Sequence, residues 1–210
     1  MVKIAFENSF WNLKGQLSVD NINNWHQDLN GSFISNFTIT GKQNNPIIRA
    51  NTTFSELNWQ RWRSNLLSLD VNYQPMQDHK IQLTLNNDQL HWDNTEKHYS
   101  VDNLLFSIDG QANNHKISAQ WLGELAGEII LTGQFNDSFS QWQSTIEKSA
   151  LSHQSITLEN DRPFAVDFDL SRQDFTLSPH CWQDKGLGLC LPQQATLGKK
   201  GDLGLKLAID

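Results

Sequence analysis

The stretch LSLDVNYQPMQDHKIQLTL, residues 67–85, decides the fold. Apolar residues occupy every second position in both of its halves, and polar residues fill the positions between them. The apolar positions are Leu67, Leu69, Val71, Tyr73, Ile81, Leu83 and Leu85. Because successive side chains of a strand point to opposite faces, each half predicts a strand with one apolar and one polar face. The Gln- and Asp-containing middle is typical of the turn that joins two antiparallel strands.

The same alternation recurs along the chain, with polar Asn-rich clusters between the runs. It is found in residues 11–19, 33–39, 104–108, 129–135, 164–170 and 203–209. Turns are expected at Asn44–Pro46, Asn86–Asp88 and Asn113–Asn114. The best helix candidate is Ser55–Arg63, and a strand explains that segment equally well. We therefore expect an all-β, mainly antiparallel amphipathic sheet with little or no helix, and a single continuous segment over residues 1–210.

A faint repeat accompanies the alternation. Gly15, Gly110 and Gly133 are each followed by Gln, inside or just after an apolar run. Glycine inside a strand often marks a bulge or a tight curve, which would suit strands added one after another to a curved sheet. Glycine is also common near turns, and that simpler explanation stays open.

Charge and motifs argue against several functions. The formal net charge of −7 repels phosphate backbones, and the basic pairs Arg61/Arg63 and Lys199/Lys200 are typical of solvated surface, so no nucleic-acid partner is expected. No nucleophile elbow, phosphate-binding loop or zinc-protease motif occurs, and the seven histidines are scattered. We expect no catalysis, no metal and no cofactor.

Eight tryptophans are many for 210 residues. They favour packing in a core or lining of an apolar groove, and Trp11 and Trp142 are in phase with their apolar neighbours. A platform for stacking sugar rings is the alternative.

Cys181 and Cys190 lie close together in the sequence. In an oxidising compartment they would close a short hairpin, with Gly186–Gly188 in its turn, and stabilise it by about 2–3 kcal/mol. In a reducing compartment they would stay reduced or bind metal with His180, although three such residues fall short of the usual structural zinc site.

The segments LSPHCW at residues 177–182 and LCLP at 189–192 resemble the TamB family, and QLHW at 89–92 followed by KHYSVDNL at 97–104 is a weaker match. The resemblance implies a curled β-sheet with an apolar inside, an open β-taco-like groove, in the periplasm of a protein anchored in the inner membrane. It also implies phospholipid transport, support of outer-membrane protein assembly, and a TamA-type outer-membrane barrel that binds other parts of the full-length protein. The alternation of residues 201–210 runs to the end of the chain, so we expect an interior section that lacks the anchor.

We therefore expect a groove that binds phospholipid acyl chains through one phase of the alternation, with a Cys181–Cys190 disulfide. The expected lining residues are Trp11, Leu13, Leu17, Val19, Phe33, Phe37, Ile39, Leu67, Leu69, Val71, Ile81, Leu83, Leu85, Phe106, Ile108, Ile129, Leu131, Phe135, Phe164, Val166, Phe168, Leu170, Leu203, Leu205 and Leu207. Two alternatives remain: a chaperone-like surface that offers sheet edges to unfolded strands, and a carbohydrate-binding β-sandwich. The alternation fits an open apolar face and a closed core equally well.

Overall fold

The computed structural model describes residues 3–7, 9–24, 26–93 and 98–198. These residues form strands that belong to a single open sheet, and every described strand pair is antiparallel. The all-β, antiparallel fold expected from the sequence is thus confirmed. Within the described part of the chain, no helix has the length and hydrophobicity needed to cross a membrane. Contacts divide the chain into two compact units, residues 1–111 with 121–124 and residues 112–120 with 125–210.

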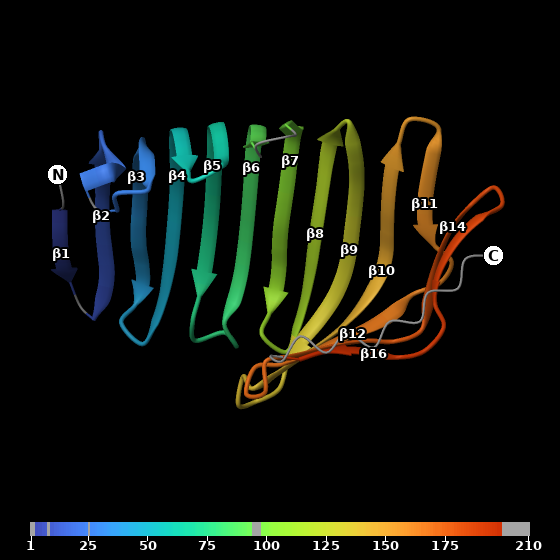
Figure 1. The fold of residues 1–210 in the computed structure, drawn as a ribbon. Helices are drawn as coiled ribbons and strands as arrows, with labels where there is room; N and C mark the ends of the chain where they lie inside the picture. The colour runs from blue at the N-terminus through green and yellow to red at the C-terminus, as the bar shows by residue number, and fades with distance from the viewer. Residues whose placement is uncertain (1–2, 8, 25, 94–97, 199–210) are drawn as a thin grey trace. The chain divides into compact units, whose positions relative to one another are not determined.

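Unit 1 is a succession of hairpins in which each strand pairs with the next one in the sequence (Figure 1). A short 3-10 turn, η1 (Ile22–Asn24), follows the second strand. The strands are β1 (Lys3–Glu7), β2 (Phe10–Val19), β3 (Leu29–Lys42), β4 (Asn45–Trp59), β5 (Trp62–Gln74), β6 (Lys80–Asp93) and β7 (His98–Gln111).

The helix candidate is strand, turn and strand. Its residues form the end of β4, a turn at Gln60 and Arg61, and the start of β5. The expected turn at Asn86–Asp88 is wrong, because these residues lie inside β6. The other two clusters do mark turns, at residues 43–44 and 112–113. Residues 86–88 do not form a turn, because Asn87 lies inside β6 at a bend of the sheet.

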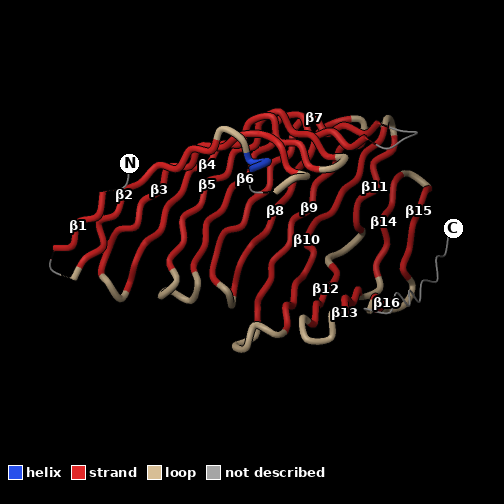
Figure 2. Tube along the Cα trace, turned by 60° about the vertical axis from the view of Figure 1, so that its left-hand side comes forward, coloured by secondary structure: helices blue, strands red, loops and turns tan. Residues whose placement is uncertain are grey.

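A row of backbone irregularities, called the kink row below, crosses the strands of unit 1 at one level. Glu56 in β4 and Gln89 in β6 have φ of 52° and 57°, in the left-handed region. The register skips Glu56 with Asn65, Asn65 with Gln89, and Gln89 with Asp102. A left-handed residue inside a strand re-aims the backbone, so β4 to β7 bend together at this row. In Figure 2 the strands of unit 1 bend near their upper ends.

Unit 2 contains a forked sheet. The first half of β10, Gln141–Ile146, pairs with β12, and its second half, Ala150–His153, pairs with β11. β13 and β16 continue from β12, while the β14–β15 hairpin continues from β11. The strands are β8 (Asn114–Gly123, whose last three residues fall in unit 1), β9 (Leu125–Phe135), β10 (Gln141–His153), β11 (Ile156–Asn160), β12 (Phe164–Asp169), β13 (Asp174–Leu177), β14 (His180–Asp184), β15 (Leu187–Leu191) and β16 (Ala195–Leu197).

Asn160 supports the backbone where this sheet forks. Its Oδ1 accepts a hydrogen bond from Ser149 N at 2.5 Å, and its Nδ2 donates to Arg162 O at 2.8 Å and to Glu147 O at 3.3 Å. Glu147 is the residue that the register of β9 and β10 skips. The amide therefore satisfies backbone groups that the fork and the bulge leave without strand partners.

Candidate functional site

One face of unit 1 is a set of apolar rows that run across the strands. One such row, in strand order, is Leu13, Ile39, Ile48, Tyr73 and Ile81, and the next is Gly15, Phe37, Ala50, Val71, Leu83 and Ile108. The registers place all fifteen expected lining residues between Trp11 and Ile108 in rows on this face. The structure thus places on one face of the sheet residues that are up to 97 positions apart (108 − 11) in the sequence.

The rows are only half-covered. All fifteen residues are partly exposed, and Leu17 is exposed at 46%. Among the residues of unit 1 whose side chains the structure describes, only Gly15, Ile22, Thr52, Ser64 and Asn87 are buried. No described strand of unit 1 therefore packs over these rows. The short turn η1, with its buried Ile22, packs on β3, and the rest of the face is open.

The bend defines which side of the sheet is concave. Asn87 in β6 and Ser64 in β5 lie on opposite sides of the kink row, and Asn87 Nδ2 donates a hydrogen bond to Ser64 Oγ. They are 3% and 5% exposed, because side chains on the inside of a bend converge. Asn87 pairs with Leu67 and Leu104 of the apolar rows, so the apolar face is the inner face of the bend.

Several members of the inner face were missed from the sequence. Phe54, Ala50 and Ile48 were missed because β4 mixes its apolar phase with Thr and Ala. Beyond the kink row the phase of the alternation shifts by one residue, which the period-two pattern does not anticipate. The members found there are Leu57, Leu90, Val101 and the aromatic residues Trp59, Trp62, Trp92 and Tyr99.

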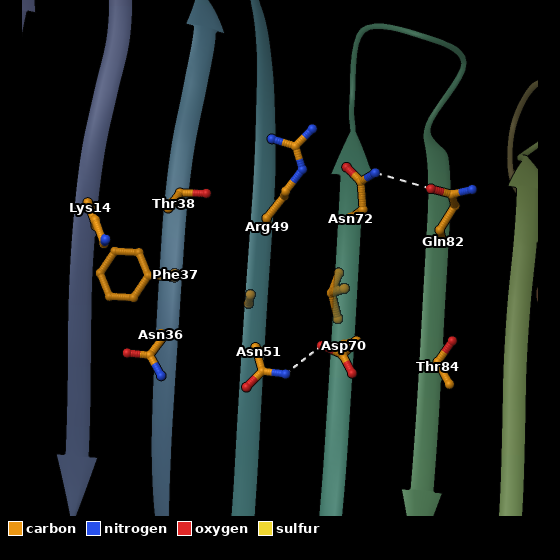
Figure 3. A pocket seen from close by; sticks show the side chains of 12 residues that line it. Lys14, Asn36, Phe37, Thr38, Arg49, Asn51, Asp70, Asn72, Gln82 and Thr84 are labelled. Atoms are coloured by element: carbon orange, nitrogen blue, oxygen red, sulfur yellow. Dashed lines mark hydrogen bonds between the residues drawn. The ribbon is translucent and has the colours of Figure 1, made fainter.

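The opposite face of unit 1 is mainly polar, although Ile34, Leu66 and Leu105 are exposed on it. Asn51 Nδ2 donates to Asp70 Oδ1 at 2.5 Å, and Asn72 Nδ2 donates to Gln82 Oε1 at 3.1 Å (Figure 3). A shallow hollow here is lined mainly by such side chains together with Lys14 and Arg49 (Figure 3). These cross-strand pairs satisfy one another on a wet surface, as expected of the solvent side of an amphipathic sheet.

Unit 2 closes its apolar residues into a core. Leu131, Ile146, Phe164 and Val166 are 8%, 8%, 4% and 3% exposed and form one cluster. Of the expected lining residues in this unit, Ile129 packs against the cluster, while Leu170 is 42% exposed. Phe135 contacts His115 and Phe139, and Phe168 pairs with Trp142 and Phe175. Leu203, Leu205 and Leu207 lie outside the described residues.

Two of the three Gly-Gln glycines lie under aromatic rings. A methyl group added at Gly15 would lie 2.3 Å from Cζ of Phe37. One added at Gly133 would lie 2.7 Å from Nε1 of Trp142 and 2.9 Å from Nε2 of His115. In both places glycine leaves room for a ring to cross the strand, which explains the repeat better than a turn does.

The cysteine hairpin closes one end of the core in unit 2. Cys181 and Cys190 are disulfide-bonded across β14 and β15, and the hairpin turns at Lys185 and Gly186. The neighbouring His180 is 1% exposed and stacks on Phe164 with ring centroids 3.7 Å apart. Trp182 meets the His180 ring edge-on at 4.3 Å and donates from Nε1 to Ser149 Oγ at 2.8 Å. The disulfide therefore fixes the strand that carries two core aromatic rings.

Two titratable groups of unit 2, Asp169 and Lys148, have structural partners. Asp169 Oδ1 accepts hydrogen bonds from Arg172 N at 3.0 Å and Ser171 N at 2.9 Å in the β12–β13 turn. The bond from Arg172 N is the largest cause that lowers the pKa of Asp169. Lys148 pairs with Glu128 across β9 and β10, and this hydrogen bond raises the pKa of Lys148.

Comparison with known proteins identifies a family for this chain. The family model described as TamB, N-terminal domain, matches residues 2–209. The protein named translocation and assembly module subunit TamB of Haemophilus influenzae (strain ATCC 51907 / DSM 11121 / KW20 / Rd) is 24% identical over 188 residues. The match covers 89% of this chain and 14% of that protein, so the chain spans a small part of its relative's length. No solved structure matches the chain.

Proposed function

Because the chain belongs to the family defined by the TamB N-terminal domain, we propose that it is a section of a periplasmic β-groove that conducts phospholipid between the inner and outer membranes. In this role it supports outer-membrane protein assembly within the translocation and assembly module, and other parts of the full-length protein bind the TamA-type partner. Residues 1–210 form one continuous segment of the full-length protein, in which unit 1 provides the groove. The observation that carries the proposal is the uncovered apolar inner face of unit 1.

An open apolar face suits acyl chains for a simple physical reason. Each methylene removed from water contributes about 0.8 kcal/mol, and an acyl chain has no hydrogen bonds to satisfy. The rows of β2 to β7 offer Leu, Ile, Val and Phe side chains that are only half-covered. Acyl chains would complete their burial without any specific polar contact.

Because unit 2 has a closed core, fewer residues are available to contact lipid than the sequence suggests. The side chains of Leu131, Phe164 and Val166 are already buried in one cluster. We therefore propose that the lipid contacts come from unit 1. The carbohydrate-binding β-sandwich has less support, because it needs a second sheet packed over the apolar face, and no described strand of unit 1 packs there.

Photo-crosslinking from neighbouring positions of β6 tests this function. A benzophenone amino acid at Leu83 faces the apolar rows, and the same residue at Thr84 faces the polar side of the same strand. After irradiation of the chain expressed in a bacterial periplasm, phospholipid adducts detected by mass spectrometry should form at position 83 and be scarce at position 84. Adducts of equal yield at both positions, or at neither, would contradict the proposal.

A further inference from the structure

An aromatic row lies on the inner face of unit 1, beyond the bend. It consists of Trp59, Trp62, Trp92 and Tyr99, each the cross-strand partner of the next. The ring centroids of Trp62 and Trp92 are 6.0 Å apart, and those of Trp92 and Tyr99 are 5.3 Å apart. Trp59, Trp62 and Tyr99 are 50%, 43% and 49% exposed. Four large, partly exposed rings thus form one strip across β4 to β7.

The strip has a fixed place in the order of side chains along the strands. Ile81, Leu83 and Leu85 of β6 come first, Leu90 follows after the bend, and Trp92 comes last. At the same end, Arg61 lies in the turn that joins the two tryptophans of β4 and β5. The inner face therefore passes from aliphatic to aromatic and ends at a turn that carries a guanidinium group.

This order matches the order of groups in a phospholipid. Trp and Tyr combine an apolar ring with a hydrogen-bond donor, so they prefer the depth at which acyl chains meet the ester and glycerol groups. Resting on the function proposed above, we propose that the aromatic row holds the glycerol–ester region of a bound phospholipid. The acyl chains then run along the strands toward Leu85, and the phosphate lies at the rim beside the β4–β5 turn.

The dimensions of the face agree with this placement. One leaflet contributes about 15 Å to a hydrocarbon core of about 30 Å. At about 3.3 Å per strand residue, that length corresponds to roughly five residues. Five positions from Trp92 along β6 is Asn87, at the inside of the bend, and Leu85 is the next apolar residue. Acyl chains anchored at the aromatic row would thus reach the bend, where Leu67 and Leu104 flank Asn87.

Quenching by brominated phospholipids tests the orientation. The chain is loaded with phosphatidylcholine that carries bromine either next to the ester groups or near the terminal methyl groups. The emission of Trp62 and Trp92 is obtained as the difference between the natural chain and its Trp62→Phe/Trp92→Phe variant. Bromine next to the esters should quench this difference emission several-fold more than bromine near the methyl end.

Trp11 provides the matched control. It lies on the same face but at the other end of the strands, since it pairs with Gly41, which pairs with Pro46 at the start of β4. The difference emission from Trp11→Phe should not show the ester-proximal preference. Equal quenching of Trp62 and Trp92 by both lipids would overturn the orientation and leave the groove intact. Failure of the chain to retain either lipid would overturn the proposed function itself. Loss of the Trp62 and Trp92 quenching on addition of a soluble oligosaccharide would identify a sugar platform instead.

Discussion

Unit 1 and unit 2 use the same alternating strands and leave their apolar side chains in different surroundings. In unit 1 each strand pairs with its neighbours in sequence order, and the apolar rows from Leu13 to Ile108 stay half-covered. In unit 2 the sheet forks at β10, and Leu131 and Val166 become 8% and 3% exposed. The comparison shows that strand connectivity, and not the alternation, decides whether an amphipathic sheet encloses its own core.

Charged substitutions should separate the two units most strongly. Leu131→Asp places a carboxylate in a closed core, so it should cost about 4 kcal/mol or more and unfold unit 2. Leu83→Asp leaves the carboxylate in contact with water and should cost about 1 kcal/mol, while it removes bound lipid. Hydrogen–deuterium exchange of each variant, read unit by unit, measures the difference.

Thr84→Lys is the charged control on the polar face of the same strand, where the added cation lies opposite Asp70. It should change neither exchange nor lipid retention. If Leu83→Asp exposes the amides of unit 1 as fully as Leu131→Asp exposes those of unit 2, then the inner face of unit 1 is a dry core and the contrast between the units disappears.

Removal of the disulfide should act on unit 2. The Cys181–Cys190 bond closes a loop of about ten residues, which corresponds to about 2–3 kcal/mol. In Cys181→Ala/Cys190→Ala we expect faster exchange in β14, β15 and the strands that contact His180 and Trp182, with unit 1 unchanged. Equal loss of protection in β4 to β6 would show that the stability of unit 1 depends on that hairpin.

Alanine substitutions at Gly15 and Gly133, the two glycines that lie under aromatic rings, compare the two units through one added methyl group. Gly133→Ala brings a methyl group against Trp142 and His115, which is buried, so relaxation is limited and the cost should be about 2 kcal/mol. At Gly15 the contact is the far edge of the Phe37 ring on an open face, so the ring can move and the cost should stay below about 1 kcal/mol. Urea denaturation of the two variants gives both values, and a larger cost at Gly15 would contradict the assignment of the open face.

The sequence predicts the strands of this chain better than their bends. Period two identifies β2, β5, β6 and β12, and fixes the shared face in unit 1, because one-sided burial needs strict alternation. It does not anticipate the kink row, where one left-handed residue shifts the phase, so Trp92 continues the apolar face of Leu85 although the two differ in parity. The fork at β10 is not predicted either, because nothing in the alternation marks Asn160, whose amide satisfies backbone groups there.

A β-branched residue at position 89 tests the bend at its smallest scale. Gln89 has φ of 57°, and valine is strongly disfavoured in this region because its branched Cβ crowds the backbone. Gln89→Val should cost about 1–2 kcal/mol, because β6 must either keep the strain or straighten. Thr84→Val, at a regular exposed position of the same strand, should cost little or stabilise the sheet.

The consequence for the inner face is more specific than the loss of stability. If β6 straightens, the phase shift disappears, and Leu90 and Trp92 turn to the polar side while Leu83 and Leu85 stay on the apolar side. Crosslinking to lipid from position 92 should then fall, while crosslinking from position 83 is kept. If both positions lose lipid to the same extent, the bend is a general requirement of the fold. Selective loss at position 92 shows that the left-handed residue keeps the aromatic row on the face that the aliphatic rows define.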